Sequence, residues 1–226
     1  MDQVRNHVTA NGHRTDRRLP TSLLPLIPEL EEAMTTLGLV ADHLVRGDVF
    51  QARATLLAIN GDPLTAYWSK KEAATRGMKP EPTVGRRGQL SEVLHRAVLE
   101  RDGWHCRYCG LRIIDRDARK RMTAMMGHDL IWGPKDSQRH AVLLVFSGVA
   151  DHVKPAATVL DQAEADDMEN LVASCWTCNF GKMEHSCEAL GLEDPRERPP
   201  LRNEWDGLRR VLWITWNPEA VDPGSR

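Results

Sequence analysis

The sequence predicts an α+β protein, in which a mainly helical N-terminal region is followed by a domain that mixes helices with strands. Three observations lead to this prediction. Apolar side chains recur at helical spacing over residues 28–46, an apolar run of strand length occupies residues 141–150, and two cysteine pairs frame the second half of the chain. With 226 residues, of which 41% are hydrophobic, the chain is long enough to bury a core.

The N-terminal region begins with a polar stretch. Residues 1–20 contain too few apolar side chains to offset the entropy of ordering them, which predicts a disordered tail. Residues 21–77 are predicted to contain a helical hairpin. Its first helix carries an apolar stripe of Leu30, Ala33, Met34, Leu37, Ala41, Leu44 and Val45. Gly47 ends that helix, and Asp48 is a predicted N-cap for a second helix that ends near Ile59, before "NGDP". The hairpin serves either as a packing module or as a surface for a protein partner or for self-association.

The rest of the chain divides at a proline- and glycine-rich stretch. "MKPEPTVGRRG", residues 78–88, is typical of a linker. The domain that follows spans residues 89–200 and begins with a helix that Ser91 can cap. Within it, the stretch at about 111–140 is predicted to be partly helical and basic. Residues 201–226 are predicted to form a C-terminal helix and a tail.

Charge and hydropathy restrict location and partners. No apolar run reaches the roughly 18 residues that a membrane span needs, and the polar N-terminus lacks the apolar core of a signal peptide, so we expect a cytoplasmic protein. The net charge is −2, but residues 69–122 hold 14 Lys and Arg against 7 Asp and Glu. This basic stretch is either a solvated face or a surface that contacts phosphates.

Four of the five cysteines form two C-x2-C pairs. Cys106, Cys109, Cys175 and Cys178 give the pattern C-x2-C-x65-C-x2-C, and two such pairs can complete the tetrahedral shell of a structural Zn²⁺. Alternatives are thioredoxin-like redox motifs, which lack their expected βαβ context here, and unrelated buried thiols. Cys187 is left over.

"RDGWHCRYCG", "DHVKP", "ENL" and "CWTCNFGK", in this order, resemble the HNH endonucleases, which are ββα-metal nucleases with a treble-clef-like fold. The likeness covers residues 90–200 and is to the subclass with a four-cysteine zinc site. It implies that His152 is the general base and that Asp151 and Asn179 bind a catalytic divalent cation. It also implies that Asn170 ties the ββ loop together and holds the base in position.

Physical chemistry is consistent with these implied roles. Cleavage of a phosphodiester needs a deprotonated water, and a histidine with a pKa near its ordinary value of about 6.5 suits that task. Adjacent strand residues point to opposite sides, so Asp151 and His152 are expected to take different tasks. Position 183 is Met where some family members have a further His, which favours Mg²⁺ or Mn²⁺ over a catalytic zinc.

The resemblance further implies a nucleic-acid partner, most simply double-stranded DNA. The lack of a long apolar run predicts no membrane partner. The residues expected to contact its backbone are Lys182, Arg116, Arg119, Lys120 and Arg121. For Lys182 a plain position on a helix surface is the alternative. The other four lie in the stretch at about 111–140, which is an insertion relative to a minimal family member and either packs on the core or contacts DNA. The competing function is a zinc-stabilised nucleic-acid-binding module that does not cleave.

Overall fold

A computed structural model describes residues 19–79, 81–85 and 90–214 of the chain. Most of the predicted N-terminal tail and the predicted C-terminal tail lie outside these residues, as do positions 80 and 86–89 in and beside the predicted linker. In chain order the helices and strands are α1 Pro28–Val45, α2 Val49–Leu57, α3 Gly61–Glu72, α4 Glu92–Arg101, α5 Arg116–Met126, α6 Ala141–Phe146, β1 Gly148–His152, α7 Gln162–Ala165, β2 Leu171–Cys175 and α8 Trp176–Lys182. The 3-10 helices are η1 Ala73–Thr75, η2 Gly127–Asp129, η3 Asp136–Gln138, η4 Ala156–Thr158, η5 Met168–Asn170, η6 Pro195–Glu197 and η7 Arg209–Trp213.

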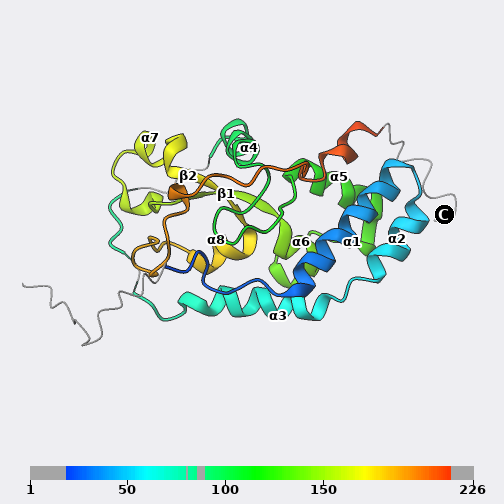
Figure 1. Cartoon of the computed structure of the whole chain (residues 1–226), viewed down its shortest axis with the longest axis horizontal. Coiled ribbons are helices and arrows are strands. Elements are labelled where there is room, and N and C mark those ends of the chain that lie inside the picture. Colours follow the sequence, from blue (N-terminus) through cyan, green and yellow to red (C-terminus); the bar gives the residue numbers. More distant parts are fainter. Residues whose placement is uncertain (1–18, 80, 86–89, 215–226) are drawn as a thin grey trace, which may run out of the picture.

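The described residues form an α+β structure with a helical N-terminal region, as predicted. The hairpin of α1 and α2 packs as two antiparallel neighbours at one end of the molecule (Figure 1). Gly47 adopts a positive φ of 76° after α1, and the Asp48 side chain accepts a hydrogen bond from the Gln51 backbone at 3.0 Å. Both signals mark the turn between the two helices as the sequence indicated. No helix in the described parts of the chain is long and apolar enough to cross a membrane.

Helix α3 was not anticipated from the sequence. The stretch "NGDP" is the start of a helix as well as the end of one, because the Asn60 side chain accepts a hydrogen bond from the Asp62 backbone at 3.1 Å. Figure 1 shows α3 running along one side of the molecule, where it packs against α6 and α8. Buried residues from both sides of the predicted linker form one continuous hydrophobic core, so residues 21–77 are part of the same folded body as the second domain.

The sheet consists of two antiparallel strands. In β1 and β2, Asp151 lies opposite Val172 and His152 opposite Leu171. The apolar run at residues 141–150, expected to be a strand, forms α6 in its first six residues and β1 only from Gly148 onward. The run is buried on nearly every side, so its composition cannot distinguish a helix from a strand. The His140 side chain accepts a hydrogen bond from the Val142 backbone at 3.3 Å and caps the helix.

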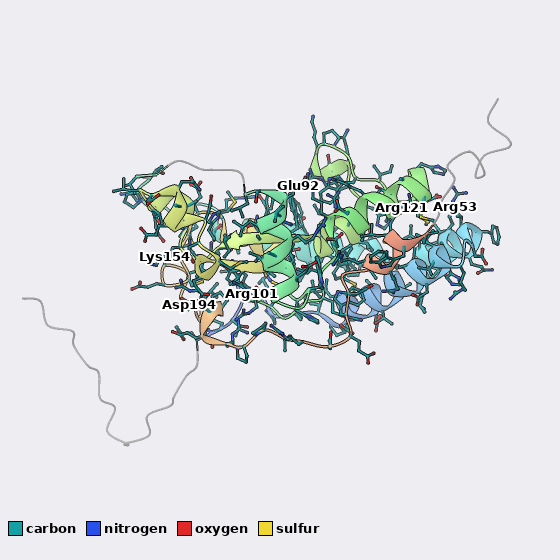
Figure 2. All side chains as sticks on the ribbon, turned by 90° about the horizontal axis from the view of Figure 1, so that it is seen from above. Arg53, Glu92, Arg101, Arg121, Lys154 and Asp194 are labelled. Atoms are coloured by element: carbon teal, nitrogen blue, oxygen red, sulfur yellow. The ribbon has the colours of Figure 1, made fainter. Side chains whose placement is uncertain are left out.

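The insertion contains the predicted helix, α5, capped by Asp115. Figure 2 places Arg121 of this helix near Arg53 of α2, at the end of the long axis opposite to Lys154, which follows β1. Within residues 201–214, the described part of the predicted C-terminal helix and tail, the helical segment is η7, a five-residue 3-10 helix. Leu208, immediately before it, has a φ of 64°, and this left-handed residue prevents the helical pattern from extending back toward Trp205.

Candidate metal centre and adjoining cavity

The four cysteines lie on two tight turns. In the first turn the Cys106 backbone donates to the Leu111 carbonyl at 2.8 Å, and Gly110 has a φ of 77° that favours glycine. In the second turn Cys175 ends β2 and caps α8, since its sulfur accepts a hydrogen bond from the Cys178 backbone at 3.3 Å. The end of β2 and the start of α8 thus place both members of the second pair.

The two pairs converge on one point. All four Sγ atoms lie within 4.8 Å of one another, with Cys109 and Cys175 separated by 3.9 Å, and none of them forms a disulfide. A tetrahedral Zn²⁺ with bonds of about 2.3 Å to sulfur requires sulfur–sulfur distances of about 3.8 Å. The predicted four-cysteine group can therefore hold a metal such as zinc. Cys187 is buried and takes no part in the group.

A lysine from the N-terminal region lies beside this group. Lys71 of α3 is fully buried, and its Nζ donates to the hydroxyls of Ser22 at 2.7 Å and Tyr67 at 3.0 Å. The Ser22 hydroxyl in turn lies 4.0 Å from the sulfur of Cys178. Burial lowers the pKa of Lys71, but the nearby cysteine thiolates, Cys178 first among them, more than offset burial and raise the pKa above its ordinary value.

A cavity of about 340 Å³ lies next to the metal group and opens between β1 and α8. Its lining residues are Asp151, His152, Pro155, Ala156, Ala157, Asn179, Phe180, Lys182, Met183 and Glu184. Three of the four residues that the sequence assigned to catalysis, Asp151, His152 and Asn179, therefore share one cavity. Adjacent residues of a strand normally point to opposite sides, but Asp151 and His152 both line this cavity because they are the last two residues of β1.

Asp151 is buried at the cavity wall and held through one oxygen. Its Oδ2 accepts a hydrogen bond from the Tyr108 hydroxyl at 2.7 Å and lies 3.3 Å from the Nζ of Lys182. Burial and the negative charge of Asp151 keep the pKa of Tyr108 well above its ordinary value, so the tyrosine remains a donor. Both contacts use Oδ2, which leaves Oδ1 for a further partner.

Lys182, predicted to contact phosphate or to lie on a helix surface, is buried at the cavity wall, which contradicts the helix-surface position. Only 3% of its side chain is exposed, and its Nζ donates to the backbone carbonyl of His152 at 2.8 Å in addition to its ion pair with Asp151. Lys182 therefore places a fixed positive charge at the wall of the cavity. This position follows from α8, which turns Lys182 back toward the end of β1.

His152 has a carboxylate partner that the sequence did not reveal. Its Nε2 lies 2.8 Å from Oδ1 of Asp166, which follows α7. An ionised carboxylate can only accept hydrogen bonds, so Nε2 carries the proton and Nδ1 is left as the acceptor. This tautomer gives His152 a basic nitrogen. No local motif surrounds Asp166, and fourteen positions separate it from His152, so only the fold identifies the pair.

Asn170 joins the two ends of the connection between β1 and β2 through its side-chain hydrogen bonds, and we call this set of bonds the loop clip. The Asn170 side-chain amide donates to the carbonyls of Lys154 at 3.1 Å and Ala165 at 2.8 Å, and its Oδ1 accepts from the Lys154 backbone at 2.9 Å. The Asn170 carbonyl also accepts from the Val153 backbone at 2.8 Å. Asn170 is buried and does not line the cavity, so its contacts are those of a residue that fixes the loop after His152.

Asn179 differs from Asn170 in its burial and in its contacts. It is half-buried, lies on α8 one residue after Cys178, and lines the cavity. Within the described residues its side-chain amide makes no hydrogen bond. An amide oxygen at this position is available to a ligand in the cavity.

The basic residues of the insertion have partners within the protein. These are Glu92 for Arg116, the Trp132 ring for Arg119, Asp117 for Lys120 and the Ile214 carbonyl for Arg121. Arg119 is largely buried, with its guanidinium 3.6 Å from the centre of the Trp132 ring, and burial lowers its pKa to about 10. Trp132 also stacks edge-on against Trp176 of α8. The insertion thus packs on the core, and none of these four residues lines the cavity.

Comparison with protein-family models, with curated proteins and with solved structures finds no significant match to this chain.

Proposed function

We propose that this chain is a metal-dependent endonuclease of the HNH type, which hydrolyses phosphodiester bonds of DNA. The observation that carries the proposal is the single cavity that gathers Asp151, His152 and Asn179 next to a four-cysteine metal group. The antiparallel pair β1 and β2, followed at once by α8, supports a ββα-metal arrangement. A histidine, a carboxylate and an amide around one cavity suit metal-assisted hydrolysis.

His152 would act as the general base. The Asp166 contact leaves its Nδ1 as the proton acceptor, and the Asn170 clip fixes the segment that follows it in the chain. In the reaction Nδ1 would take the proton of a water molecule, whose oxygen attacks the phosphorus while the bond to the 3′ oxygen breaks, and the 3′ oxygen would take a proton from solvent to become a hydroxyl. A general base of this kind contributes about 10²- to 10⁴-fold in rate.

Asp151 and Asn179 would hold Mg²⁺ or Mn²⁺, because carboxylate and amide oxygens are the ligands that these ions prefer. When bound, the cation neutralises charge on the phosphate and the leaving oxygen. Tyr108 holds Oδ2 of Asp151 in place, and Lys182 adds a positive charge at the same wall, where a phosphate would sit. The four-cysteine group would hold Zn²⁺ as a structural ion outside this chemistry.

Plasmid nicking tests the proposal. The wild-type protein, with Mg²⁺ or Mn²⁺, is expected to convert supercoiled DNA to open circles and linear molecules with 5′-phosphate ends. His152→Ala should lower the rate by about 10²- to 10⁴-fold. His128→Ala is a matched control, because His128 is exposed in the insertion and away from the cavity. Equal cleavage by wild type and His152→Ala would refute the assignment of His152 as the base.

The ion pair between Lys182 and Asp151 favours a second candidate function. A buried ammonium 3.3 Å from the carboxylate competes with a divalent cation for that carboxylate. A protein in which the lysine holds this position permanently would be a zinc-stabilised nucleic-acid-binding module without cleavage. DNA binding that weakens steeply with salt, with no cleavage under any divalent ion, would support the module and contradict the nuclease.

A further inference from the structure

Lys71 is a fully buried lysine without a carboxylate partner in the described parts of the chain. Its two hydrogen-bond acceptors, the hydroxyls of Ser22 and Tyr67, are both neutral. Removing an ammonium from water costs several kcal/mol, and a buried lysine keeps its charge only where hydrogen bonds and a nearby negative charge offset that cost. A charged Lys71 therefore needs an anionic group close to it.

The four-cysteine group is that neighbour. Ser22 bridges the two, since its hydroxyl accepts a hydrogen bond from Lys71 at 2.7 Å and lies 4.0 Å from the sulfur of Cys178. Lys71, Ser22 and Cys178 also surround one small internal space. A dication on four thiolates carries a net charge of −2, so the group is strongly anionic when a metal is bound.

Helix α3 is pressed close to α8 at this point. A side chain at Gly181 of α8 would have its Cβ only 2.7 Å from the Lys71 carbonyl and 3.1 Å from the Lys71 Cγ. Glycine at position 181 therefore permits the close approach of the two helices. The lysine is held in a fixed place by packing along its stem and by two hydroxyls at its tip.

We infer that Lys71 is the buried counter-charge of the four-cysteine metal site, positioned by Ser22 and Tyr67. The N-terminal helical region is then a functional part of the metal site, and metal binding and the docking of α3 on α8 stabilise each other. Lys71 acts on the metal through the charge it places beside the thiolates and is not itself a ligand. The inference rests on the proposed binding of zinc by the four cysteines and is independent of DNA cleavage.

The test compares Lys71→Met with Lys70→Met in the full-length protein. Lys70 is the exposed neighbour on the same helix, so its variant removes the same charge and the same chemical group from the surface. Zinc and cobalt(II) affinities are measured by competition with a chromogenic chelator. Loss of an outer contact of a metal site typically weakens binding by about 10- to 100-fold, which is the change expected for Lys71→Met. Lys70→Met should bind like wild type.

A second measurement separates charge from packing. A defect in packing at position 71 would lower the stability of the metal-free and zinc-loaded proteins alike, whereas loss of a charge that supports metal binding acts mainly on the zinc-loaded protein. Lys71→Met should therefore lower the melting temperature of the zinc-loaded protein by more than that of the metal-free protein. Lys71→Arg, which keeps the charge, should recover part of the metal affinity.

The outcomes are distinguishable. If the wild type binds no zinc, the proposed metal site is wrong. If the wild type binds zinc and Lys71→Met binds it equally well, or if the substitution lowers the stability of the metal-free and zinc-loaded forms by the same amount, the inference about Lys71 is wrong while the metal site stands.

Discussion

Asn170→Ala tests the loop clip directly. The substitution removes three side-chain hydrogen bonds and leaves both backbone groups of Lys154 and the Ala165 carbonyl without these partners, of which the bond to Ala165 is buried and the two to Lys154 are partly buried. At about 1 kcal/mol for each bond, the free energy of unfolding should fall by about 2 to 4 kcal/mol. For a chain of this size the melting temperature should fall by about 4 to 15 °C. Urea and thermal unfolding followed by circular dichroism measure both quantities.

Asn179→Ala is the matched control for this substitution. Asn179→Ala removes the same amide group, but from a side chain that has no hydrogen bond within the described residues. The free energy of unfolding of Asn179→Ala should therefore stay within about 0.5 kcal/mol of wild type. Cleavage should nevertheless be lost if Asn179 holds the catalytic cation. A stability of Asn170→Ala within 1 kcal/mol of wild type would refute the clip, and unfolding of Asn179→Ala would show that Asn179 has a structural task.

Three further predictions concern the two sites. If the chain is the proposed nuclease, Asp166→Ala should lower nicking by about tenfold to a hundredfold, less than His152→Ala, because His152 keeps its nitrogen but loses the contact that fixes its tautomer. Cys178→Ser removes a metal ligand, so zinc affinity should fall by more than about 100-fold, the upper end expected when only an outer contact is lost. Metal analysis after gel filtration measures the zinc that remains bound. Burial raises the pKa of Cys187 to about 11, so at pH 8 it should react with iodoacetamide about a hundredfold more slowly than a thiol of pKa about 9, as followed by mass spectrometry.

Each of these has a contradicting result. Nicking by Asp166→Ala at the wild-type rate would show that the carboxylate does not orient the base. Full zinc content in Cys178→Ser would mean that the other three cysteines suffice. Rapid alkylation of Cys187 in the folded, zinc-loaded protein would show that the thiol is accessible in solution.

The features that the sequence predicted well depend on short stretches of chain. Gly47 and Asp48 mark the turn between α1 and α2 because a left-handed residue and an N-cap act within one turn of helix. The two C-x2-C pairs were expected to share an ion, and their sulfurs do converge. Each C-x2-C pair lies on a tight turn set by its own local residues, and the fold then brings the two turns together so that the four sulfurs converge.

The features that the sequence did not predict depend on contacts between distant segments. Helix α3 has a weak apolar pattern, and Lys71 on it is buried where α8 packs against α3 near Cys178. Asp166 reaches His152 across a loop, with no spacing that would single it out. The helix α6 arises because a run that is buried on nearly every side carries no periodicity to distinguish a helix from a strand.

Tyr108 connects the metal group to the cavity. It lies between Cys106 and Cys109, so the turn that those cysteines form sets the position of its ring, and its hydroxyl holds Asp151 at 2.7 Å. On the other side, Cys178 precedes Asn179 by one residue on α8. The two proposed cation ligands are therefore each attached to a different half of the four-cysteine group, one by a hydrogen bond and the other by a peptide bond. A metal that holds the two halves together would fix the separation of Asp151 and Asn179, so a structural ion outside the chemistry would still determine whether the cavity can bind a second one.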